Sequence, residues 1–371
     1  MAMDSQDQRV KGIRRIFGRL TCQRGIALLV TLSVMAVLVP ATLELNRYVR
    51  TSVTETSAAK DRMALSYMAD SGIEAAMALL IEDRGQSEAD SLAEDWAKPE
   101  KLDMLSAAIP FERGNVTIRI ADEKSRIQVN ALVDFPESRA FNEPQRQLWE
   151  RILQGLSMGS DFYRDLDATM VINSLKDWLD SGDEEAITGL SGAESDYYQA
   201  LDPPYQSRNG PIMHIDELAR VRGLNRAYLY GNHDIPGIAD FLTPFGISQE
   251  AGNELVYGGN ININTAALPV LAAMLPVEST DLAEAIFEYR QAAIDDDLID
   301  LFTDPAWYRS APGCADLEID PALLTVSSHL FRVESIASID SRQLTVAAVI
   351  RRVQDTQSGN WKAEILRRTT K

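Results

Sequence analysis

The sequence predicts an α+β fold in which a long N-terminal helix packs on a small antiparallel sheet, with a large all-α domain inserted between the strands. Three observations predict it. An uncharged apolar run near the N-terminus continues into helix-forming sequence. Segments with strand periodicity lie before and after the middle of the chain, and the long block between them has helical periodicity.

The first predicted element is a membrane-spanning helix. Residues 1–24 contain six basic and two acidic residues, and the nineteen residues from Gly25 to Leu43 carry no charge. A run of this length crosses a hydrocarbon core of about 30 Å as a helix. The basic cluster is expected to keep the N-terminus in the cytoplasm, so the bulk of the chain lies on the far side. A buried core helix would leave the position of the basic cluster unexplained.

A proteolytic site is expected at the start of this helix rather than at its end. A secretory signal peptide needs small residues after the apolar run, and Pro40-Ala41-Thr42 meets that requirement weakly. Gly25 instead follows the basic cluster directly and precedes Ile26. A basic leader, a glycine and a retained apolar helix are typical of type IV prepilin-like substrates, which a membrane peptidase cleaves after the glycine.

The helix is expected to continue beyond the membrane, because residues 58–82 are rich in Ala, Met, Leu and Glu, which are good helix formers. One face of this segment carries small and apolar side chains at helical spacing. We expect that face to pack on a sheet, and its residues are Leu65, Met68, Gly72, Ala75 and Leu79.

Strand signals flank the helical block. Residues 114–132 predict a hairpin with ADEKS as its turn, and three segments after residue 327 predict strands, the first two joined at Asp340-Ser341. The predicted domains are a leader at 1–25, the transmembrane and N-terminal helix at 26–84, the first part of the α/β domain at 85–139, the inserted helical domain at 140–326, and the C-terminal strands at 327–371.

Four segments together resemble the type II secretion minor pseudopilin K family, also called the general secretion pathway protein K family. They are RGIALLVTLSV, IADEKSRIQVNALV, LKDWLDSGDEE with the DYY…DPPY…ELARVRG stretch that follows, and NININTAALPVLAAML. The resemblance runs from about residue 24 to the C-terminus. It implies a type IV pilin-like fold, a single-pass location in the bacterial inner membrane with the bulk in the periplasm, and a methylated mature N-terminus.

The position five residues after the cleavage point separates this chain from most pilins. Most pilins and pseudopilins carry glutamate there, and this chain carries Val30. A carboxylate in hydrocarbon needs a partner, and in pilins it is thought to pair with the N-terminal ammonium of the neighbouring subunit. The resemblance therefore implies a tip subunit that initiates or caps a periplasmic pseudopilus. The partners it implies are minor pseudopilins I and J, the major pseudopilin and the prepilin peptidase.

One alternative is a DNA-binding pilus component of a competence-type system. The segment NINTAALPVLAAMLPVESTDLAEAIFEYR resembles a helix-hairpin-helix unit, whose turn normally offers glycine amides to a phosphate. Here the turn carries Glu278 and Asp281, and the whole chain has a formal net charge of -19. Because like charges repel phosphate, we expect no nucleic-acid partner.

A membrane-anchored periplasmic enzyme is the other alternative. The three histidines do not form HExxH, and the chain contains no GxSxG, P-loop or GxGxxG pattern. Cys314 is expected to be an inert thiol rather than a nucleophile. We therefore predict that the protein is not an enzyme.

A calcium site is predicted in the helical block. DWLDSGDEE and the ESD that follows place several carboxylates around a glycine-containing loop, and Ca²⁺ takes six to eight oxygen ligands. The spacing differs from that of an EF-hand, and a solvated acidic face would explain the same pattern. The family resemblance also implies calcium sites here. The predicted ligands are Asp180, Asp183, Glu184, Glu194 and Asp196.

The processing prediction is tested on the mature protein. Mass spectrometry should find Ile26 as the N-terminal residue, N-methylated, because cleavage follows Gly25. Changing Gly25 to Leu should block processing and leave the leader attached. An intact leader on the wild-type protein would contradict the assignment.

Overall fold

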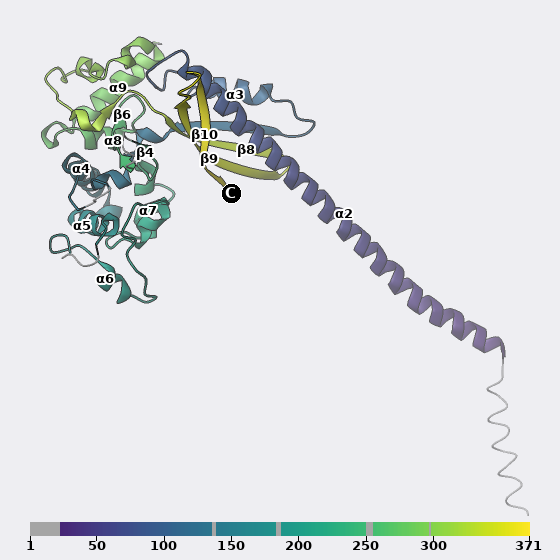
Figure 1. The fold of residues 1–371 in the computed structure, drawn as a ribbon. Helices are drawn as coiled ribbons and strands as arrows, with labels where there is room; N and C mark the ends of the chain where they lie inside the picture. Colours follow the sequence, from purple (N-terminus) through teal and green to yellow (C-terminus); the bar gives the residue numbers. More distant parts are fainter. Residues whose placement is uncertain (1–22, 136–138, 183–186, 250–254, 297) are drawn as a thin grey trace, which may run out of the picture. The chain divides into compact units, whose positions relative to one another are not determined.

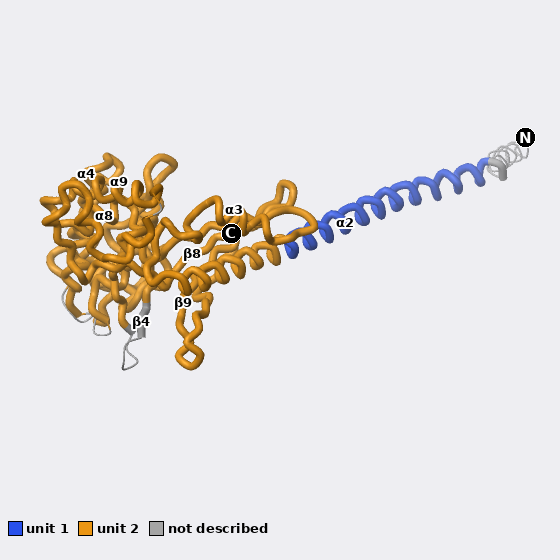
Figure 2. The backbone as a smooth tube through the Cα atoms, turned by 90° about the horizontal axis from the view of Figure 1, so that it is seen from above, with its two compact units in different colours: residues 1–64 blue, residues 65–371 orange. Residues whose placement is uncertain are grey.

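The computed structural model describes residues 23–135, 139–182, 187–249, 255–296 and 298–371. The chain divides into two compact units, residues 1–64 and residues 65–371 (Figure 2). The predicted leader therefore lies almost wholly outside the described residues.

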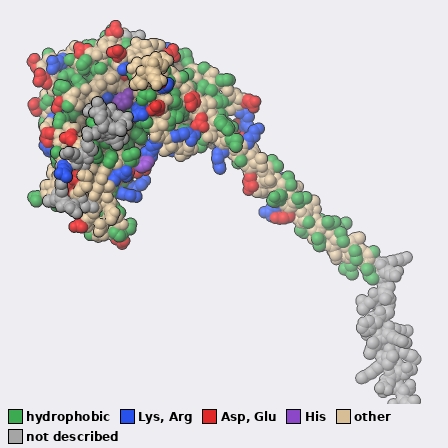
Figure 3. Space-filling view, viewed as in Figure 1, with side chains coloured by type: hydrophobic (Ala, Val, Ile, Leu, Met, Phe, Trp, Pro, Cys, Tyr) green, Lys and Arg blue, Asp and Glu red, His purple; other side chains and the backbone are tan. Residues whose placement is uncertain are grey.

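The described part of the first unit is helical. Helix α2 spans Gln23–Arg84, and its residues up to 64 belong to this unit. Its most apolar 18-residue stretch has a mean hydropathy of 2.4, and none of that stretch is buried. Hydrophobic side chains cover much of this part of α2 in the view of Figure 3. The helix is long and apolar enough to serve as a membrane anchor.

The second unit is built on a four-stranded antiparallel sheet in the order β1-β8-β9-β10 (Figure 1). Helix α3, Pro99–Ala108, packs beside β1. The Asp340-Ser341 turn joins β8 to β9 as predicted, with Asp340 at a φ of 52°. The strands are β1 (Asn115–Asp122), β8 (Leu330–Ile339), β9 (Arg342–Gln354) and β10 (Trp361–Thr370).

The last turns of α2 pack on this sheet, as the sequence predicts. At Gly72 an added Cβ would lie 2.2 Å from Ser335 Oγ on β8, so the helix approaches the strand at a residue without a side chain. The face of α2 that packs on the sheet is rotated slightly about the helix axis from the predicted face. The smallest residues form the centre of the contact, which buries Ala69 and Ala76 and leaves Ala75 and Leu79 only half-buried.

The predicted hairpin at 114–132 is wrong. Strand β1 pairs with β8, with Asn115 opposite Ser338 and Asp122 opposite Phe331. The chain then leaves the sheet through a 3₁₀ turn at Glu123–Ser125, and β2 (Ile127–Gln128) pairs in parallel with β3 (Leu242–Thr243). The reason is tertiary: Asp122 and Glu123 are buried and hydrogen-bonded to distant segments, so ADEKS is not a solvent-exposed turn.

The insertion lies between β1 and β8. It also contains two further strand pairs, β4 (Ile247–Gln249) with β5 (Leu255–Tyr257) and β6 (Ile261–Asn262) with β7 (Leu324–Thr325). Its α-helices are α4 (Glu143–Gly159), α5 (Ala168–Leu179), α6 (Ser195–Gln199), α7 (Arg226–Tyr230), α8 (Leu268–Met274) and α9 (Leu282–Asp295). Its 3₁₀ helices include Val129–Leu132, Asp161–Tyr163, Ile215–Arg220, Ile238–Phe241, Val277–Ser279, Ile299–Thr303, Trp307–Ser310 and Pro321–Leu323.

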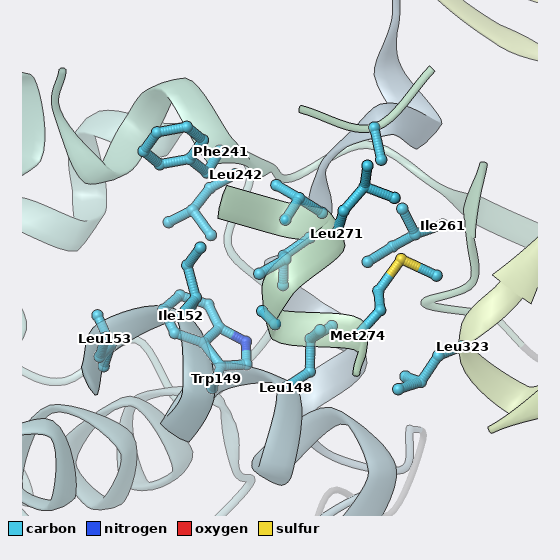
Figure 4. Close-up of a cluster of buried hydrophobic side chains, with 14 of the residues drawn as sticks. Leu148, Trp149, Ile152, Leu153, Phe241, Leu242, Ile261, Leu271, Met274 and Leu323 are labelled. Carbon is cyan, nitrogen blue, oxygen red and sulfur yellow. The ribbon is translucent and has the colours of Figure 1, made fainter. Parts of the chain in front are cut away.

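One hydrophobic cluster forms the core of the insertion. The apolar face of α4, with Leu148, Trp149 and Ile152, meets Leu271 and Met274 of α8 (Figure 4). Each of these side chains is at most 2% exposed, so together they remove a large apolar area from water. Helix α4 begins next to Pro144, as the sequence predicts, because proline is tolerated in the first turn.

The residues of this cluster also indicate where the inserted domain begins. Ile127, Val129 and Leu132 belong to it, although they precede the predicted start of the helical domain at residue 140. We therefore propose that the inserted domain begins directly after β1 and ends at β8. The C-terminal boundary near residue 327 stays as predicted from the sequence.

Candidate functional site

The predicted processing residues lie at the beginning of α2. Gly25, Ile26 and Val30 have exposed, regular helical backbone around them, and Val30 is 55% exposed. Among the described residues, no atom lies within 4 Å of a Cβ built on Gly25. None of these residues therefore packs against the predicted cleavage point.

An acidic cluster forms where α5 ends and α6 begins. Asp177, Asp180 and Glu194 are buried, and each offers an oxygen atom within 4.8 Å of the others. Asp180 is the C-cap of α5 and Glu194 the N-cap of α6, so two helix ends converge on this point. Asp177 joins them because it lies three residues before Asp180 on the same face of α5.

This arrangement includes some of the predicted calcium ligands. Asp180 and Glu194 come together, whereas Asp196 is exposed on α6 and lies apart from the cluster. Asp183 and Glu184 lie outside the described residues. Asp177 was not among the predicted ligands, although its helical spacing from Asp180 is readable in the sequence.

The chemistry of the cluster suits a hard cation. Burial raises the pKa of Asp180, which means that its carboxylate lacks the solvation it would have in water. Lys176 Nζ lies 3.0 Å from Asp180 Oδ2, and the Thr188 amide donates to Asp177 at 3.1 Å. Carboxylate oxygens are the ligands that Ca²⁺ prefers, and three of them converge here from two helix ends.

A second acidic cluster already contains a cation. Asp83, Asp90 and Glu94 lie together, and the guanidinium of Arg352, on the inner strand β9, is fully buried among them. Arg352 Nη1 lies 3.2 Å from Asp83 Oδ2, and its Nη2 donates to Asp90 Oδ1. Burial raises the pKa of Asp83 to about 7. Because the Arg352 guanidinium occupies the space between these carboxylates and pairs with Asp83 and Asp90, we do not assign a metal to this cluster.

The same region joins the sheet to the insertion. Asp122, at the end of β1, accepts hydrogen bonds from Asn262 Nδ2 at 2.9 Å and from Thr265 Oγ1 at 2.7 Å. Asn264 Nδ2 donates to the carbonyl oxygen of Phe302, and its Oδ1 accepts from Trp307 Nε1 at 2.7 Å. Asp122 belongs to the segment IADEKSRIQVNALV, and Asn262, Asn264 and Thr265 belong to NININTAALPVLAAML. Sequence reasoning singled out both segments without predicting that they touch.

The segment that resembles a helix-hairpin-helix unit forms α8, a turn and α9. The turn contains the 3₁₀ helix Val277–Ser279, so Glu278 lies within it. Cys314 is buried and free, and burial raises the pKa of its thiol, as expected for an inert cysteine.

Comparison with known proteins supports the sequence resemblance. A family model described as "Type II secretion system (T2SS), protein K" matches residues 125–230. The chain is 24% identical to the type II secretion system protein K of Aeromonas hydrophila, over 91% of this chain and 96% of the relative. It is 28% identical to the protein K of Klebsiella pneumoniae, over 71% of this chain and 73% of that relative.

A solved structure has the same fold. It is the crystal structure of the GspK-GspI-GspJ complex from the type 2 secretion system of enterotoxigenic Escherichia coli, matched with a TM-score of 0.58 and 18% identity. The match covers 85% of this chain and 99% of that chain. The long helix, the antiparallel sheet and the inserted helical region are therefore features of a known architecture.

Two neighbouring arginines test the buried cluster. Changing Arg352 to Leu should lower the free energy of unfolding by about 3–5 kcal/mol, because Asp90 would keep a buried charge without its partner. Changing Arg351 to Leu removes a partly exposed ion pair with Glu364 and should cost about 0–1 kcal/mol. Urea unfolding of the full chain in detergent measures both, and equal losses would contradict a structural role specific to Arg352.

Proposed function

The chain belongs to the type II secretion system protein K family and is a minor pseudopilin, and from that premise we propose that it is the tip subunit of a periplasmic pseudopilus. The observation that carries this proposal is Val30 at the fifth position of the predicted mature chain. A subunit stacked above would bring an N-terminal ammonium into the membrane-derived helix bundle. Without a glutamate at this position the chain offers that ammonium no carboxylate partner, so the top of the filament is the place that suits it.

The insertion agrees with this position. It has a hydrophobic core of its own and occupies the connection between β1 and β8, the first two neighbours in the sheet. A subunit that has no other subunit above it has room for such an addition. We propose that the insertion caps the filament and faces the secreted substrates or the outer-membrane channel.

The partners follow from the same premise. The related solved structure contains GspK, GspI and GspJ, and we propose that this chain assembles with minor pseudopilins I and J. The remaining proposed partners are the major pseudopilin below it, the prepilin peptidase that cleaves after Gly25, and the inner membrane that holds α2 before assembly. In this role the chain acts as a structural component of the secretion machinery rather than as an enzyme.

The tip role is tested with the full chain co-expressed with I and J. Solubilisation in detergent should recover a complex of all three, and omission of either partner should reduce recovery of the other. Immunogold labelling of sheared pseudopili should then mark one end of each filament. Labelling along the length, or no complex with I and J, would contradict the proposal.

We propose that Ca²⁺ binds the cluster of Asp177, Asp180 and Glu194. Carboxylate oxygens are the ligands it prefers, and burial of all three leaves few water molecules to screen their repulsion. The ion would tie the end of α5 to the start of α6 and so stabilise the insertion.

Calcium binding is measured by thermal unfolding of the full chain in detergent. Calcium at about 100 times its Kd should stabilise the folded protein by about 2.7 kcal/mol relative to a chelator. Changing Asp180 to Asn should remove most of that gain. Changing Asp196 to Asn is the matched control, since this carboxylate is exposed, and should leave it unchanged. Equal effects of the two variants, or no gain in the wild-type protein, would exclude this site.

A further inference from the structure

A cavity of about 310 Å³ lies where β2 meets β3, on the side of the insertion that adjoins β8. Its walls include Lys124, Gln128 and His329, together with the glycine backbone of Gly246 and Gly259. The cavity lies apart from the cluster of Asp177, Asp180 and Glu194 and shares none of its residues. Neither the pseudopilin role nor the calcium site uses it.

A fixed amide donor faces this cavity. Gln128 is 5% exposed, and its Oε1 accepts a hydrogen bond from the Asn130 amide at 2.7 Å. Because this acceptor must be the amide oxygen, the other terminal atom of the side chain is the donor Nε2. Among the described residues Nε2 has no hydrogen-bond partner. A buried amide N–H without an acceptor costs about 1–3 kcal/mol, which a bound acceptor would recover.

Glycine backbone leaves the space in front of this donor open. Gly246 has a φ of 141°, and a Cβ there would lie 2.9 Å from Gln128 Nε2. Gly259 has a φ of 68°, and a Cβ there would contact Gln145 Nε2 at 2.4 Å. A side chain at Gly246 would therefore crowd Gln128 in the wall of the cavity, whereas one at Gly259 would crowd Gln145, which does not line it.

A cation also lines this cavity. No ion pair or side-chain hydrogen bond of the Lys124 ammonium occurs within the described part of the chain, and burial lowers its pKa, with Asp122 and Asp90 opposing that change. The neighbouring His329 is uncharged near neutral pH, because burial lowers its pKa to about 4. The Glu123 carboxylate also lines the cavity, but Arg126 and Arg332 both bind it.

We propose that this cavity binds a carboxylate group, held by the Lys124 ammonium and the Gln128 Nε2 amide. One cation that makes no ion pair with any described residue and one neutral donor match a singly charged planar anion. A phosphate dianion would require further positive charge, and the Asp122 and Asp90 carboxylates nearby oppose it. The carboxylate belongs either to a free small acid or to the C-terminus of a peptide chain.

The test uses competitive labelling of lysines in the full chain in detergent. A trace N-hydroxysuccinimide ester is added with acetate, with N-acetylglycylglycine, with the amide of that peptide, or with inorganic phosphate, and mass spectrometry measures labelling at each lysine. A carboxylate present at about twice its Kd should lower labelling of Lys124 about threefold, because one third of the sites stay free. Lys101, which is exposed on α3, should be unaffected.

The four arms separate the sources and the alternatives. If acetate and the peptide both protect Lys124 from labelling, a free small acid is sufficient for binding. If only the peptide protects Lys124, the ligand is the C-terminus of a peptide chain. Equal protection by the peptide amide, equal or stronger protection by phosphate, or no protection at all would overturn the proposal.

A variant isolates the amide donor. Changing Gln128 to Glu keeps the oxygen that accepts from Asn130 and replaces Nε2 with a second oxygen, which repels an anion. Protection of Lys124 should then be lost. Unchanged protection in this variant would overturn the assignment of Gln128, and the wild-type arms stand independently if the variant does not fold.

Discussion

The structure depends on the burial of charged and amide side chains at the junction between the sheet and the insertion. Asp122 and Glu123 leave β1 at the point where the chain departs from the pilin-like sheet, and both are nearly or fully buried. A buried carboxylate is strongly destabilising unless it is hydrogen-bonded or paired. Each therefore requires partners from the rest of the chain, and those partners are Asn262, Thr265, Thr243 and Arg332.

This requirement joins segments that are far apart in sequence. Asn262 donates both to Asp122 and to the carbonyl oxygen of Asp90. The carboxylate of Asp90 in turn accepts from the guanidinium of Arg352 on β9. The connection from β1, the return from the insertion and the last hairpin of the sheet thus share one network. A small sheet can accommodate an insertion of this size between β1 and β8 because both ends of the insertion are bonded to the same buried groups.

The contacts of Arg352 extend this junction to α2. Arg352 pairs with Asp90 and also donates to the carbonyl oxygen of Leu80 on α2 at 3.2 Å. The elements that would contact substrate or channel are thereby coupled to the helix that would pack in the filament. The carboxylate cavity lies directly against this junction, since Lys124 and His329 each adjoin one of its buried residues.

The sequence by itself determined the elements whose signal is local: the uncharged run after Gly25, the missing glutamate at Val30, the α4 periodicity after Pro144, and the turn at Asp340. Each depends on spacing or charge along a few residues. Only the tertiary structure decided that ADEKS is not a hairpin turn, that Asp177 rather than the exposed Asp196 meets Asp180 and Glu194, and that Gln128 faces a cavity. The physical reason is that the sequence does not show whether water or a distant side chain forms the hydrogen bonds of a carboxylate or an amide. Only the folded structure determines which of the two does.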